Sequence, residues 1–135
     1  MTARNIWKAA FLVWLVVLFL SSTSEVGEFA SDWYDDYLDD SLQQFGLDSD
    51  VAQKLLHVVL FVVLGWLVAE LKLPPSAPWV RSLVWCFPIG AVTELIQIVM
   101  DGRGPSFLDA LINGVAGTLS CRLALWLASR RQAES

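Results

Sequence analysis

Four long apolar stretches constrain what this chain can fold into. They cover residues 6–20, 51–73, 80–100 and 107–127, and a helix needs about 20 apolar residues to cross the roughly 30 Å hydrocarbon core of a bilayer. The 135-residue chain is 56% hydrophobic, which is more apolar surface than so short a water-soluble domain can bury. The sequence therefore predicts an all-α integral membrane protein in which four spanning helices form a bundle.

The first apolar stretch has two interpretations. It is the shortest of the four and is flanked by Arg4 and Lys8, as in a cleaved signal peptide. No A-x-A-like cleavage site stands out in residues 21–24, so we favour a retained membrane anchor. The chain then divides into an anchor with an acidic external segment (1–50), a three-span core (51–128) and a cytoplasmic tail (129–135).

Charge asymmetry predicts the orientation, because Lys and Arg near the ends of spans are preferentially kept in the cytoplasm. Seven bases fall on one side of the four predicted spans: Arg4, Lys8, Lys72, Arg81, Arg122, Arg130 and Arg131. The first loop, residues 21–50, carries nine acids and no base. We therefore expect both termini in the cytoplasm and the acidic loop outside.

The acidic loop has a helical pattern of its own. Aromatic and leucine residues recur in it at steps of three and four, with the aspartates mostly on the other side: Phe29, Trp33, Tyr34, Tyr37, Leu38, Leu42 and Phe45. This pattern predicts an external amphipathic helix that lies on the membrane surface between the first two spans. A disordered acidic linker is the alternative, and the acid spacing does not fit an EF-hand calcium loop.

Polar and ionisable residues interrupt the last three apolar stretches in pairs. They are Lys54 and His57, then Glu94 and Gln97, then Asp109 and Asn113, and each pair shares one helix face because its members are three or four residues apart. At a rise of about 1.5 Å per residue, Lys54, Gln97 and Asp109 lie roughly 3 to 5 Å below the outer boundary, and the other three roughly 9 to 10 Å below it. Polarity is thus concentrated at the external end, with Asp101 and Arg103 directly above.

Such residues are costly in a bilayer and often mark function, so we expect an outward-facing polar pocket. His57 and Glu94 are the candidate catalytic acid/base pair. The candidate ligand-binding residues are Lys54, Gln97, Arg103, Asp109 and Asn113, of which the two bases would hold an anionic headgroup. Alternatively the polar groups join the helices without chemistry, with Lys54 paired to Asp109 and His57 to Glu94.

Other classes of site receive little support. The net charge of −5 and the lack of a basic stripe argue against nucleic-acid binding. Cys86 and Cys121 both lie in apolar stretches, which predicts small buried side chains and neither a disulfide framework nor a zinc site. No metal and no cofactor is predicted, and Ala110, Gly114, Gly117 and Ser120 form a small-residue face suited to close helix packing.

The ordered set of polar residues resembles the VanZ-like family of small bacterial membrane proteins. The resemblance covers about residues 50 to 120 and consists of Lys54-x-x-His57, Glu94-x-x-Gln97, then Arg103, Asp109 and Asn113 leading into Gly117. Gln53 stands where many relatives have an acid, and Ala116 and Ser120 stand where glycines are frequent. The resemblance implies a bacterial cytoplasmic (inner) membrane protein of the cell envelope, with a link to low-level resistance to the glycopeptide antibiotic teicoplanin.

Three functions remain open at this point. The first is recognition of an anionic envelope lipid or cell-wall precursor by the external pocket. The second is an enzyme that uses His57 and Glu94 on such a headgroup, and the third is a membrane scaffold whose polar residues hold the helices together. Transport is less favoured, because no charged path continues to the cytoplasmic side.

Overall fold

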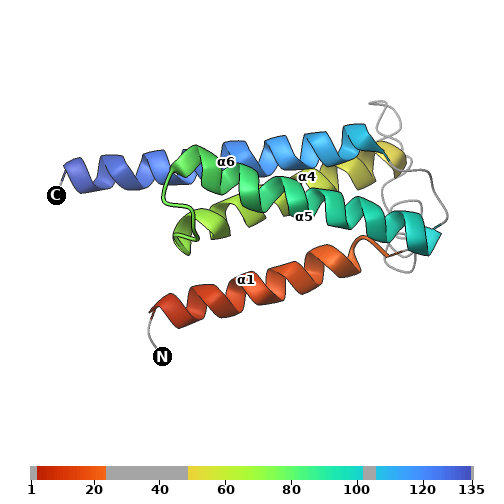
Figure 1. The fold of residues 1–135 in the computed structure, drawn as a ribbon, viewed down its shortest axis with the longest axis horizontal. Helices are drawn as coiled ribbons and strands as arrows, with labels where there is room; N and C mark the ends of the chain where they lie inside the picture. The colour runs from red at the N-terminus through yellow and green to blue at the C-terminus, as the bar shows by residue number, and fades with distance from the viewer. Residues whose placement is uncertain (1–2, 24–48, 102–105, 135) are drawn as a thin grey trace.

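The computed structural model of the protein describes residues 3–23, 49–101 and 106–134. These residues form four helices and no strand (Figure 1): α1 (Ala3–Leu20), α4 (Ser49–Glu70), α5 (Pro78–Asp101) and α6 (Phe107–Ala133). The all-helical prediction is confirmed, and each helix coincides with one apolar stretch. The predicted surface helix in residues 29–45 lies outside the described residues.

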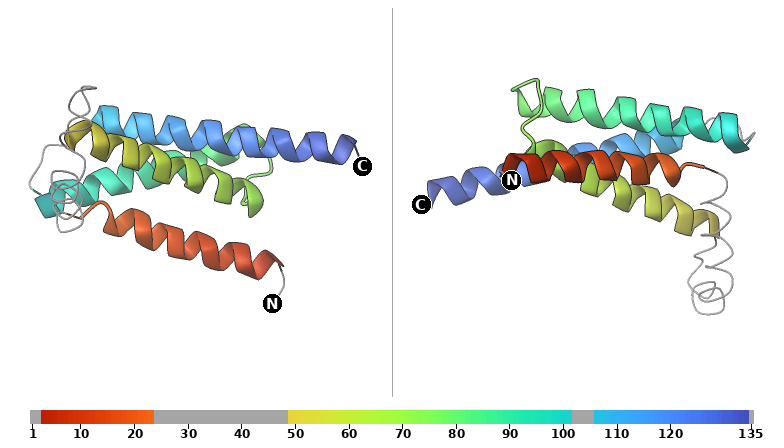
Figure 2. Two further views of the ribbon diagram at one scale, coloured as in Figure 1. Left: turned by 180° about the vertical axis from the view of Figure 1, so that it is seen from behind. Right: turned by 90° about the horizontal axis from the view of Figure 1, so that it is seen from below.

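Helix α6 is the central element of the fold. It packs along both α4 and α5, whereas α4 and α5 contact each other much less. The chain reverses direction between α4 and α5 and again between α5 and α6. The start of α4, the end of α5 and the start of α6 therefore meet at one end (Figures 1 and 2). Both termini lie toward the opposite end.

Small residues allow the three helices to approach closely. A Cβ atom added at Gly65 of α4 would stand 2.0 Å from the backbone oxygen of Gly117 in α6, and one added at Gly117 would stand 2.9 Å from the Cys86 sulfur in α5. The Ser120 hydroxyl also donates a 2.6 Å hydrogen bond to the Val62 backbone oxygen. The small-residue face of α6 thus packs inside the bundle.

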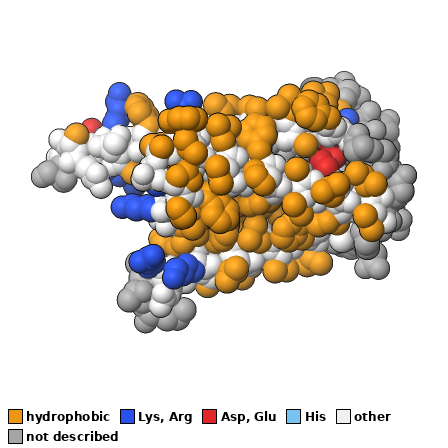
Figure 3. All heavy atoms as spheres, viewed as in Figure 1, with side chains coloured by type: hydrophobic (Ala, Val, Ile, Leu, Met, Phe, Trp, Pro, Cys, Tyr) orange, Lys and Arg blue, Asp and Glu red, His pale blue; other side chains and the backbone are white. Residues whose placement is uncertain are grey.

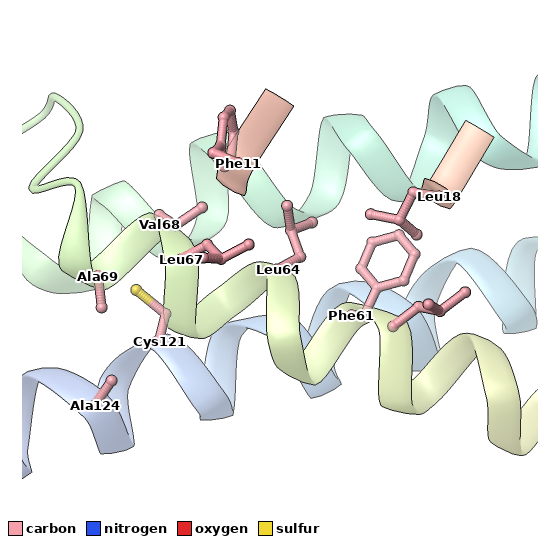
Figure 4. Packing of buried hydrophobic residues seen from close by; sticks show 10 residues of the cluster. Phe11, Leu18, Phe61, Leu64, Leu67, Val68, Ala69, Cys121 and Ala124 are labelled. Carbon is pink, nitrogen blue, oxygen red and sulfur yellow. The ribbon is translucent and has the colours of Figure 1, made fainter. Parts of the chain in front are cut away.

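Helix α1 lies beside this three-helix core and contacts mainly α4. Its Phe11 and Leu18 are buried against the apolar face of α4 (Figure 4). Phe11 also meets Trp85 of α5 edge to face, with 6.2 Å between ring centroids. The Trp14 indole donates a 2.9 Å hydrogen bond to the Leu60 backbone oxygen. These contacts attach the first helix along the side of α4.

The connection between α4 and α5 is held by two side chains of α5. Arg81 is 7% exposed, and its guanidinium donates to the backbone oxygens of Leu73, Pro75 and Ser76. The Trp85 indole donates a 2.7 Å hydrogen bond to the Pro74 oxygen. In the sequence, Arg81 is one of the bases that predict the orientation. In the structure its side chain stabilises the loop between α4 and α5.

The outside of the molecule is largely apolar. Hydrophobic side chains cover its middle in the view of Figure 3, and Lys and Arg side chains gather toward one end. Two helical segments, Pro78–Val99 and Phe107–Ala133, are long and apolar enough to cross a membrane, and only about a third of each is buried within the fold. The predicted tail from residue 129 continues α6 as helix to Ala133.

The glycine contact between α4 and α6 generates a matched pair of variants. Gly65→Ala forces a methyl group against the Gly117 backbone, and overpacking of this kind costs about 1 to 3 kcal/mol. At Gly90 an added Cβ would meet its nearest atom, the Ala110 oxygen, at 3.4 Å. Gly90→Ala should therefore be neutral or slightly stabilising.

Thermal unfolding of the purified protein in detergent micelles measures both effects. We expect a lower midpoint for Gly65→Ala than for the native chain, and no loss for Gly90→Ala. Equal midpoints for the two variants would contradict the close crossing of α4 and α6.

Candidate functional site: a polar cluster at one end of the bundle

The close contact of α4, α5 and α6 determines where the predicted polar residues lie along the bundle axis. Gly65, Gly117 and Cys86 lie at one level, and the sequence positions 57, 109 and 94 are each eight residues from them (65 − 57, 117 − 109, 94 − 86). Because the chain direction alternates, all three offsets lead toward the same end, a distance of about 12 Å along each helix. His57, Asp109 and Glu94 therefore come to one level from three different helices.

Two further predicted residues join them there. Gln97 lies one turn beyond Glu94 on α5, and Asn113 lies one turn after Asp109 on α6. Five residues thus form a polar cluster at this end of the bundle: His57, Glu94, Gln97, Asp109 and Asn113. Glu94 is 8% exposed and Asn113 is 2% exposed, whereas His57, Gln97 and Asp109 are half-buried.

His57 and Gln97 contact each other across α4 and α5. Nε2 of the Gln97 amide lies 3.4 Å from Nε2 of the imidazole. Since an amide nitrogen only donates, the imidazole Nε2 accepts, and the proton of a neutral ring then lies on Nδ1. Nδ1 is buried without a hydrogen-bond partner among the described residues. The contact thus leaves a buried donor free.

Glu94 and Asp109 lie near the beginning of α6. The Ser106 side chain caps this helix by accepting a 3.2 Å hydrogen bond from the Asp109 backbone nitrogen, and the Ser106 backbone lies beside the Glu94 carboxyl group. Asp109 interacts electrostatically with both Glu94 and His57. Acidic groups are favourable here, because the first turn of a helix carries a partial positive charge.

The predicted pairings differ from the contacts found. No ion pair joins His57 to Glu94 or Lys54 to Asp109 in the part of the chain that the structure describes, and His57 contacts Gln97 instead. Lys54 is exposed at the same end. Arg103 lies outside the described residues. In residues 3–23, 49–101 and 106–134, no three His, Cys, Asp or Glu side chains are arranged to hold a metal ion.

Sequence reasoning missed the role of Ser106. The segment Ser106-Phe107-Leu108-Asp109 has the S-x-x-D spacing that often precedes a helix, in which the serine side chain caps the backbone three residues later. That signal was present in the sequence. The cap fixes the backbone of the first turn of α6, which carries Asp109.

Comparisons with known proteins do not identify the chain. No family model, no curated protein and no solved structure matches it.

The contact between His57 and Gln97 can be measured with a double-mutant cycle. Interhelical hydrogen bonds in membrane proteins contribute about 0.6 kcal/mol on average, so His57→Ala and Gln97→Ala should show a coupling energy of about that size. Unfolding of the four proteins of the cycle in mixed micelles gives this value.

A matched cycle uses His57→Ala with Ser129→Ala, since Ser129 is exposed near the C-terminal end of α6. Its coupling energy should be close to zero. A His57–Gln97 coupling no larger than this control would contradict the arrangement of the cluster.

Proposed function

We propose that the chain is a VanZ-like, four-span protein of the bacterial inner membrane whose polar cluster recognises an anionic envelope lipid or cell-wall precursor from the external side. In this proposal α1 and α4 span the membrane together with α5 and α6, and both termini are cytoplasmic. The cluster is the ligand-binding part of the protein.

The observation that carries the proposal is the free Nδ1 donor of His57. A buried polar group without a partner costs about 1 to 3 kcal/mol, and this cost is removed when a ligand oxygen accepts the hydrogen bond. The phosphate group of a lipid offers such oxygens. Lys54, exposed at the same end, supplies the positive charge that an anionic headgroup requires.

The carboxyl and amide groups of the cluster suit the rest of such a ligand. Glu94, Asp109 and Asn113 offer acceptors, and Asn113 also a donor, for the hydroxyl and amide groups that headgroups and cell-wall precursors carry. The phosphate would be held near His57 and Lys54, and the neutral polar groups near α6.

An enzyme of acid/base type is the second candidate. His57 and Glu94 lie at one level, and Asp109 interacts electrostatically with both. In that case His57 would transfer a proton to or from a headgroup while a carboxylate stabilises its charged form. Recognition is the simpler proposal, because it requires no nucleophile and no leaving group.

Binding of a short-chain phosphatidic acid to the purified protein in phosphatidylcholine nanodiscs tests recognition. Lys54→Gln and His57→Phe should each weaken binding about tenfold, since a charge-assisted hydrogen bond is worth about 1.5 kcal/mol or more. Ser129→Ala, at the other end of α6, should bind as the native chain does.

Unchanged affinity in both Lys54→Gln and His57→Phe would refute the recognition site. If these variants lowered the unfolding midpoint without changing the affinity, the cluster would be structural. Mass spectrometry of envelope lipids from cells with and without the protein separates binding from catalysis, because only an enzyme changes the products.

The orientation is tested by a reporter fused after Asp48. We expect this position outside the cytoplasm, since the first loop carries nine acids and no base. An alkaline phosphatase fusion, which is active only outside, should therefore be active there and inactive after Gln132. Activity of the fusion after Gln132 alone would reverse the proposed topology.

A further inference from the structure

A second charged surface lies at the opposite end from the polar cluster. Six exposed bases from three parts of the chain make up this basic end: Arg4, Lys8, Lys72, Arg122, Arg130 and Arg131. Acids are fewer among the described residues there, namely Glu70 and Glu134. The buried Arg81 is not included, because its guanidinium is bound to the loop carbonyls.

Exposed tryptophans accompany these bases. Trp7 of α1, Trp79 of α5 and Trp126 of α6 are 37%, 61% and 48% exposed. Tryptophan concentrates where hydrocarbon meets headgroups, because its ring is apolar while its N–H needs a polar partner. Arg130 also lies over the Trp126 ring, with 4.2 Å from its guanidinium carbon to the centroid.

Distances along the helices place Arg130 and Arg131 beyond the tryptophans. From the level of Cys86 and Gly117, Trp79 lies about 10 Å and Trp126 about 14 Å toward the basic end, whereas Arg130 lies about 20 Å away. The headgroup zone on each side of the hydrocarbon is roughly 5 to 8 Å deep. With the tryptophans at the edge of the hydrocarbon, Arg130 and Arg131 reach the level of the phosphates.

We propose that the basic end binds the headgroups of anionic phospholipids in the leaflet at that side of the membrane. The charges are complementary, and α6 extends past the other helices toward the C-terminus (Figure 1), which carries its arginines into the headgroup layer. Arg122, Trp126 and Arg130 are four residues apart and share one face of α6. This stripe holds a lipid phosphate by Arg130 while Trp126 packs on the chain below it.

This inference rests on the membrane placement in the proposed function, and not on the polar cluster. It assigns a lipid preference to the basic end, whereas the proposed envelope ligand binds at the polar cluster. The two sites lie at opposite ends, so variants in one leave the other unchanged.

Native mass spectrometry of the full chain tests the proposal. Micelles contain equal amounts of phosphatidylglycerol and phosphatidylcholine, and the lipids retained by the protein are counted. We expect the native chain to retain phosphatidylglycerol preferentially. The variant Arg122→Gln/Arg130→Gln/Arg131→Gln should retain at least fivefold less phosphatidylglycerol, since each of the three bases near an anionic surface contributes about this factor.

Two matched variants make the outcome specific. Arg122→Lys/Arg130→Lys/Arg131→Lys keeps the charges and should keep the preference. Ser129→Ala changes an exposed, uncharged residue near the same end and should also keep it. Retention of the preference in the glutamine triple variant would overturn the proposal.

Fluorescence quenching gives a second measurement that uses the native sequence. Brominated phosphatidylglycerol should quench the tryptophans more than brominated phosphatidylcholine, and Trp126→Phe should reduce this difference. Equal quenching by the two lipids would overturn the proposal.

Discussion

The close contact between the Gly65 and Gly117 backbones is the constraint on which the rest of the structure depends. It brings α4 against α6, and Cys86 of α5 packs against the same glycine of α6. A larger side chain at either glycine would separate the helices. Since the three helices are locked at this level, His57, Glu94 and Asp109 arrive together about 12 Å away. The same packing contact places Trp79 and Trp126 toward the opposite end of the bundle.

The polar cluster and the basic end give the molecule two chemically different ends with an apolar middle. In the proposed membrane placement, the exposed leucine, valine and tryptophan side chains contact lipid, while the polar groups avoid the hydrocarbon centre. At the basic end, Arg81 donates hydrogen bonds to the backbone oxygens of the α4–α5 loop. At the end of the polar cluster, the Ser106 side chain accepts a hydrogen bond from the first turn of α6. The proposed ligands would bind at these two ends, the anionic phospholipid at the basic end and the envelope ligand at the polar cluster.

Much of the fold could be predicted from the sequence, because apolar stretches of about 20 residues specify helices almost by themselves. The predicted and observed helix ends agree within a few residues except at the C-terminus, where α6 continues to Ala133. Polarity alone suggested a tail there, but Arg130 and Arg131 favour the last turn of a helix. Helix α5 continues through Pro88.

The members of the polar cluster could also be predicted, since spacings of three and four residues put them on common faces. Their partners could not. Whether His57 meets Gln97 or Glu94 depends on how far α4 and α5 rotate about their axes, and that rotation follows from packing at Gly65, Cys86 and Gly117 rather than from the polar residues. The Ser106 cap had a sequence signal of its own, while the burial of Arg81 depends on a loop conformation that the sequence pattern does not specify.

The most direct test of the account is cross-linking between α4 and α5 in native membranes. With Cys86 and Cys121 replaced by alanine, cysteines are introduced at His57 and Gln97, and a bifunctional thiol reagent spanning the interhelical distance of about 8 to 10 Å is added. The account predicts efficient cross-linking of this pair and none between cysteines at Val59 and Leu95, which are exposed on the same two helices. Cross-linking of Val59 with Leu95, and not of His57 with Gln97, would contradict it.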